Sequence, residues 1–132
     1  MGEKENIMNN KEKIAEAKHI IGMLECDEID HDEVNARFEC LIYNEEYTCL
    51  EDMACWSFYT TSYDACHSIT PKGWYYYMSH NVGIYSLVMH KGEYNSVISD
   101  YDIQFLGENH TSMPIAWLEA ILQAMIWELE ND

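Results

Sequence analysis

The central part of the chain contains two strand-like segments, residues 74–79 and 84–89, joined by the turn sequence Asn81-Val82-Gly83. Asparagine and glycine favour tight turns between antiparallel strands, so this pattern predicts a β-hairpin. Apolar or aromatic side chains occupy both alternating sets of positions in each segment. Because alternate residues of a strand point to opposite faces, we expect both faces of the hairpin to be covered.

A third strand is predicted at residues 97–106, and its two faces differ. Aromatic and aliphatic residues occupy one alternating set of positions, whereas Asp100 and Asp102 occupy the other. The acidic face is therefore expected to contact water or a partner. Residues 54–59 are a candidate for a further short strand, and residues 107–111 are expected to form a loop.

Helix signals mark four segments, which are residues 11–24, 30–43, 62–69 and 113–130. Apolar residues recur three and four positions apart in the longer segments, as on the buried stripe of a helix. Asp30, Ser62 and Ser112 stand where an N-cap side chain is expected. Pro114 fits the first turn of the last helix, where a missing N–H group costs little.

These elements predict one α+β domain over residues 11–132, preceded by a flexible tail at residues 1–10. Its central antiparallel β-sheet is expected to lie between N-terminal helices and a C-terminal helix, as an α/β/α layered sandwich. Trp117 and Trp127 fall outside the buried stripe of the last helix. They either pack against a second element or face a partner subunit, which leaves a homo-oligomer open.

The chain has 24 acidic residues against 7 basic ones, for a formal net charge of −17. A surface that binds duplex DNA or anionic lipid needs clustered lysine and arginine, so we expect no direct contact with nucleic acid or membrane. The first residues are charged and no apolar run approaches 18 residues, which predicts neither a secretion signal nor a transmembrane helix. Five cysteines, an odd number, fit reduced thiols in a cytoplasm.

Residues that could perform chemistry form no known catalytic or metal-binding motif. The spacing of the cysteines matches no zinc module, so no metal or cofactor is expected. Asp64, Cys66 and His67 are close in sequence, but a nucleophile, a base and an acid must meet in space. Because Asp64 fits the first turn of a helix capped by Ser62, we expect no catalytic residue and no enzyme activity.

Two short motifs and the final helix suggest a family. Tyr59-Thr60-Thr61-Ser62-Tyr63-Asp64-Ala65 follows the pattern Y-T-x-S-x-D-A, and Pro71-Lys72-Gly73-Trp74 follows P-x-G-W. The last helix then opens on Pro114 and continues with alanine-rich apolar turns. Over roughly residues 12–130 the chain resembles small phage and prophage proteins of the phage ABA sandwich type. The resemblance implies a layered fold and a phage setting, but no reaction.

The charge and the resemblance together favour a non-enzymatic, phage-encoded binding protein. We expect it to inhibit a basic host protein that handles nucleic acid or defends the host, such as a CRISPR effector, in the host cytoplasm. One alternative is sequestration of a nucleotide signal by the Tyr/Trp-rich sheet, with Lys72 or Lys91 at its phosphates. Another is a phage structural or assembly protein. The carboxylates expected to bind the partner are Glu45, Glu46, Glu51, Asp52, Asp100 and Asp102.

Overall fold

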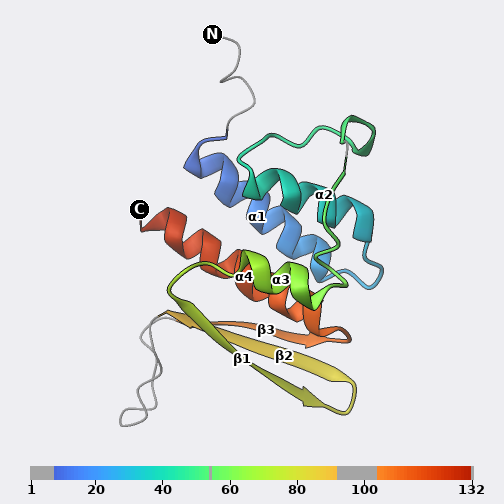
Figure 1. The fold of residues 1–132 in the computed structure, drawn as a ribbon, viewed down its shortest axis with the longest axis vertical. Helices are drawn as coiled ribbons and strands as arrows, with labels where there is room; N and C mark the ends of the chain where they lie inside the picture. The colour runs from blue at the N-terminus through green and yellow to red at the C-terminus, as the bar shows by residue number, and fades with distance from the viewer. Residues whose placement is uncertain (1–7, 54, 92–103, 132) are drawn as a thin grey trace.

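A computed structural model describes residues 8–53, 55–91 and 104–131 (Figure 1). In chain order the elements are α1 (Asn10–Leu24), α2 (His31–Ile42), the 3-10 turn η2 (Leu50–Asp52), α3 (Tyr63–Ile69), β1 (Trp74–Asn81), β2 (Ile84–Lys91), β3 (Gln104–His110) and α4 (Met113–Glu130).

The three strands form one antiparallel sheet in the order β1-β2-β3. Val82 and Gly83, the two residues between β1 and β2, have φ values of 48° and 78°. Positive φ at both positions is the geometry of tight hairpin turns whose twist matches that of the strands. The predicted hairpin is therefore confirmed, with Tyr77 opposite Val88 near its centre.

Capping side chains fix where the helices begin. Asn9 and Glu12 form a reciprocal capping box at α1, in which each side chain accepts from the other residue's backbone N–H. Asp30 caps α2 as predicted, and Ser62 caps α3 by accepting from the backbone N–H of Ala65 over 3.1 Å. These bonds satisfy N–H groups that the first turn of a helix leaves without a helical partner.

Helix α4 lies at the centre of the molecule. It packs on β2 and β3 on one side and on α1 on the other, and Figure 1 shows it between the sheet and the α1–α2 pair. Residues 113–122 and Ala124 are all buried. A helix that is apolar on all sides is stable only when surrounded by other elements, which is the position α4 occupies.

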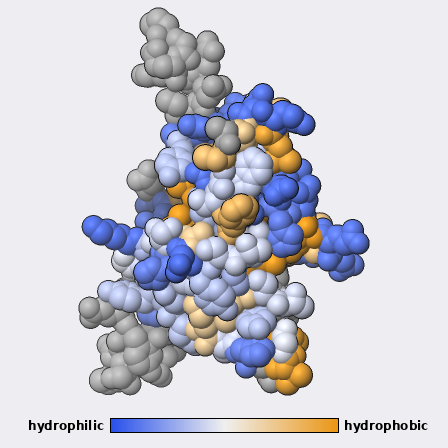
Figure 2. Space-filling view, turned by 45° about the vertical axis from the view of Figure 1, so that its right-hand side comes forward, coloured by the Kyte–Doolittle hydropathy of each residue, from blue (hydrophilic) through white to orange (hydrophobic). Residues whose placement is uncertain are grey.

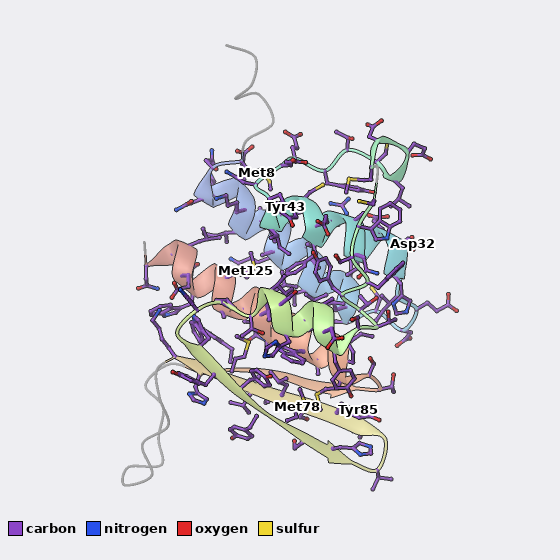
Figure 3. All side chains as sticks on the ribbon, viewed as in Figure 1. Met8, Asp32, Tyr43, Met78, Tyr85 and Met125 are labelled. Carbon is purple, nitrogen blue, oxygen red and sulfur yellow. The ribbon has the colours of Figure 1, made fainter. Side chains whose placement is uncertain are left out.

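The α+β class is confirmed, with an antiparallel sheet and helices before and after it, but the layers are ordered differently from the expectation. Within the described residues the helices cover one face of the sheet, so the order is sheet, α4, then α1 with α2. Figure 3 shows rings projecting from the opposite face. Tyr75, Tyr77, Ile84 and Leu106 on that face are 46%, 53%, 47% and 39% exposed. Tyrosine tolerates water through its hydroxyl, so apolar alternation on both faces did not require two covers.

Two local predictions were wrong. Residues 55–58 do not form a strand, because α2 side chains hold this part of the chain in place. Glu39 accepts from the Ser57 N–H over 3.1 Å and from the Tyr59 hydroxyl over 2.7 Å. The loop expected at residues 107–111 is instead mostly strand, since β3 runs to His110; residues 97–103 of the predicted third strand lie outside the described residues.

Gly107 lets β3 approach α4 closely. A Cβ atom at this position would lie 1.8 Å from the carbonyl oxygen of Ala116 and 2.7 Å from its carbonyl carbon. Both atoms belong to the helix backbone, which cannot move aside as a flexible side chain can. The distance between sheet and central helix therefore depends on glycine at position 107.

Gly107→Ala should lower the free energy of unfolding by about 2 kcal/mol or more, because the added methyl group forces β3 away from α4. Urea denaturation followed by tryptophan fluorescence measures this change.

The matched control is Gly22→Ala in α1, where a Cβ atom would meet nothing within 4 Å. This change should raise stability by about 0.5–1 kcal/mol, since alanine favours the helix. A Gly107→Ala protein as stable as the wild type would contradict the close approach.

Candidate functional site

The largest of the described cavities lies between the C-terminal end of α1, the segment that connects α1 to α2, β3 and α4. Its volume is about 720 Å³. We call it the connector pocket, and its lining consists of Ile21, Leu24, Glu25, Cys26, Asp27, Ile29, Leu106, Thr111, Ile115, Glu119 and Gln123.

The pocket combines apolar walls with carboxylates at two depths. Leu24 and Ile115 are buried and form part of the apolar wall. Glu25 and Asp27 are exposed, whereas Glu119 on α4 is 6% exposed. A site of this kind can hold a ligand that has both an apolar body and a positive charge.

The end of α1 adds to the negative potential of the connector pocket. The C-terminal end of a helix carries partial negative charge, which basic side chains in the last turn often offset. The last turn of α1 contains no basic residue. Within the described residues, lysine and arginine are also missing from the lining of the pocket. The site therefore favours cations and repels phosphate groups.

Four of the predicted binding carboxylates lie elsewhere, in the connection between α2 and α3. These exposed residues are Glu45, Glu46, Glu51 and Asp52. Figure 1 shows this connection at the end of the helical layer away from the sheet. Thr48 Oγ1 donates to Asp52 Oδ2 over 2.6 Å, and this bond lowers the pKa of the Asp52 carboxyl. The connection thus forms a second acidic surface, separate from the connector pocket.

Asp100 and Asp102, the other two predicted binding residues, lie outside the described residues. The carboxylates of the connector pocket were not predicted as binding residues, because Glu25 and Asp27 fall between the helices predicted at residues 11–24 and 30–43 and belong to no binding motif. One signal could have found Glu119, which is a carboxylate within an otherwise apolar stretch of the last helix. Such a residue is seldom buried without a specific reason.

The two tryptophans of α4 pack within the chain. Trp117 is 2% exposed, its ring lies 4.5 Å from that of Tyr76, and its Nε1 donates to Thr70 Oγ1 over 3.1 Å. Trp127 packs edge-on against Trp74 at 6.1 Å between ring centroids. Of the two predicted alternatives, burial against another element therefore holds for Trp117.

Lys91 sits between aromatic rings at the other end of the sheet from the hairpin turn. Its Nζ lies 5.4 Å from the Trp74 ring centroid and 5.2 Å from that of Trp127, and it also pairs with Glu128. Cation–π contacts and the ion pair together hold this amino group in place. Lys91 is consequently less available than Lys72 for a phosphate group.

Cys66 is a poor candidate for a nucleophile. Its side chain is buried, and its thiol donates to the Tyr59 carbonyl over 3.1 Å. Burial raises the pKa of the Cys66 thiol to about 12, so the reactive thiolate is scarce at neutral pH. The ring of the exposed His67 packs instead against those of Tyr76 and Trp117. No group of three His, Cys, Asp or Glu side chains suited to a metal ion occurs in the described part of the chain.

Cys66 should not react with the thiol reagent DTNB at pH 8 until the protein unfolds, whereas the exposed Cys26 and Cys55 react rapidly. Wild type and Cys66→Ala should therefore show the same amplitude of rapid reaction. In denaturant, where every thiol is accessible, the variant should release one equivalent of chromophore less. A smaller rapid phase in the variant would contradict the buried, protonated state of Cys66.

Comparison with known proteins identified no relative of this chain. No family model matches the chain, and neither a curated protein nor a solved structure matches it. The resemblance to the phage ABA sandwich type therefore stays a prediction, and function has to be argued from the described residues.

Proposed function

We propose that the protein is a non-enzymatic binding protein whose acidic exterior engages a basic surface of another protein. The observation that supports this most directly is the number of exposed carboxylates that form no ion pair with lysine or arginine within the described residues. In the described part of the chain, the ion pairs of lysine and arginine join Arg37 to Glu16 and Glu33, and Lys91 to Glu128. The acidic residues of both connecting segments are outside these pairs.

Figure 2 shows the most hydrophilic side chains concentrated over the helical part of the molecule, while the sheet end is mostly intermediate in hydropathy. The exposed carboxylates of the two connecting segments are Glu25, Asp27, Glu28, Asp30, Glu45, Glu46, Glu51 and Asp52. Like charges gathered within each of these two segments create a potential that speeds encounter with an oppositely charged partner.

The partner we favour is a host protein that handles nucleic acid or defends the host, including CRISPR effectors. Such a protein carries a basic groove, and a duplex spanning about 35 Å would bring roughly 20 phosphate charges to it. The formal net charge of −17 is of the same order. Occupying the groove would inhibit the host protein without any chemical step. The phage origin rests on the sequence resemblance alone.

A second candidate function is nucleotide binding at a smaller cavity of about 400 Å³ beside the start of β1. Its lining joins the turn sequence Pro71-Lys72-Gly73 to the aromatic residues His67, Trp74, Tyr75 and Tyr76. Aromatic rings can stack on a base while the exposed Lys72 faces a phosphate. This combination of rings and a lysine suits a nucleotide. The acidic connector pocket, which has no lysine in its described lining, would instead repel the phosphates.

Neutralising the α2–α3 connection should weaken partner binding by roughly tenfold or more, because it removes four attractive charges. The variant combines Glu45→Gln, Glu46→Gln, Glu51→Gln and Asp52→Asn. Immobilised wild-type protein and variant are exposed to bacterial lysate, captured proteins are identified by mass spectrometry, and affinities are then measured with the purified partner. Capture by the wild type should also decrease between about 0.05 and 0.5 M salt.

The matched control removes the same four charges near the chain ends, through Glu3→Gln, Glu5→Gln, Glu130→Gln and Asp132→Asn. It should retain the partner. Equal loss in both variants would mean that net charge alone governs capture, and it would contradict a defined acidic binding surface.

Nucleotide binding predicts a higher melting temperature in the presence of the correct nucleotide, since a ligand that binds only the native state stabilises it. Differential scanning fluorimetry with a panel of mono-, di- and cyclic nucleotides measures this shift. Lys72→Ala should abolish the shift, and Lys18→Ala, which changes an exposed lysine of α1, should retain it. A panel that produces no shift in the wild type removes this candidate.

A further inference from the structure

We propose that the connector pocket receives one arginine side chain of the protein partner. The inference rests on the proposed function, and it adds to it a defined anchoring point and the residue type that fills it. The small cavity beside Lys72 and the exposed sheet face offer no comparable charge match to a basic partner.

The shape of the pocket suits a long side chain with a charged head. Ile115, Glu119 and Gln123 follow one another at intervals of four residues, so they share one face of α4 and form the floor. Ile21 on α1 and Leu106 on β3 also line the pocket; the Leu106 side chain lies on the sheet face away from the helices, and its backbone carbonyl faces Gln123. Gln123 Nε2 donates to the Leu106 carbonyl over 2.9 Å, which ties the floor to β3. The methylene groups of arginine can pack on Ile21 and Ile115 while its guanidinium group reaches the rim carboxylates.

The charges of the pocket fit a guanidinium group. Glu25 and Asp27 lie exposed at the rim, whereas Glu119 in the floor already interacts with another group of the chain, so the two rim carboxylates are the ones open to a ligand. Arginine has five N–H donors in a planar fork, so one guanidinium group can bind carboxylates on different sides of a pocket. The partial negative charge at the C-terminal end of α1 also attracts the positively charged guanidinium group. Within this partly enclosed site, electrostatic attraction is stronger than at an open surface.

Other occupants fit this lining less well. A phosphate ligand would be repelled by Glu25, Asp27 and Glu119. An apolar peptide segment would cover the exposed carboxylates of Glu25 and Asp27 without supplying a positive charge, which is unfavourable. A second copy of the chain would bring its own acidic surface against this one. A lysine side chain supplies the charge but only a compact ammonium group, so it should bind more weakly than arginine.

The test uses the full-length protein and a small probe, N-acetyl-arginine N-methylamide, in a titration followed by ¹H–¹⁵N NMR spectra. We expect saturable shifts of the backbone amides of Ile21, Cys26, Leu106 and Gln123, with a dissociation constant in the range of about 0.1–10 mM for a probe of this size. The citrulline analogue has nearly the same shape but no charge, and it should cause no saturable shift. The lysine analogue should bind at least roughly threefold more weakly.

Variants at the rim test the assignment without changing the core. Glu25→Gln combined with Asp27→Asn should weaken probe binding roughly tenfold. Glu45→Gln combined with Glu46→Gln, which makes the same change in net charge on the other acidic surface, should leave it unchanged. Thr111→Arg adds a guanidinium group at an exposed position of the lining and should block the probe while the melting temperature stays near that of the wild type.

Three results would overturn the proposal. The first is the absence of a saturable shift up to about 20 mM arginine probe, which is 20-fold above the middle of the expected range. The second is equal shifts with the citrulline analogue, and the third is an equal loss of probe binding in both double variants. Capture of the partner separates this inference from the proposed function. If Thr111→Arg retains the partner fully, the pocket is not the anchor although the protein binds a partner. If the probe binds but no partner is captured, the pocket is correct and the proposed function is wrong.

Discussion

Burial of the first half of α4 on every side is the constraint on which the rest of the structure depends. Gly107 lets β3 rest against the backbone of Ala116, while Trp117 reaches Thr70 beyond α3. The helix has no exposed face in this stretch, so each neighbouring element is positioned by its own contact with α4. Replacing a side chain here disturbs both the sheet and the α1–α2 pair, because interiors are closely packed.

The connector pocket follows from that arrangement. α1 and β3 both pack on α4 but do not close over it completely, and residues of all three elements line the gap. The acidic segment after α1 then passes beside the opening. A buried, apolar scaffold thus forms the inner part of the cavity, and the connecting segment places the exposed Glu25 and Asp27 at its opening. The more distant acidic connection between α2 and α3 has no comparable support from α4.

Local rules were sufficient to predict the four helices and the β-hairpin from the sequence, but not the irregular segment at residues 55–58 or the extent of β3. The caps at Asp30 and Ser62 and the turn at Val82-Gly83 depend on neighbouring residues alone, and all are confirmed. The uncovered face of the sheet could not be predicted, because tyrosine suits both a buried and an exposed position. The connector pocket was missed for a related reason, since Glu25, Leu106 and Glu119 are distant in sequence and only the packing of three elements brings them together.

The central position of α4 also affects how the protein is made. Every other described helix and strand precedes α4 in the chain, so these elements are synthesised before the helix on which they pack is complete. Until then the apolar stripes of α1 and the inner face of the hairpin have no permanent cover. Nascent chains should therefore depend on chaperones until residue 130 has emerged, and assembly of the core should then proceed almost as a single event.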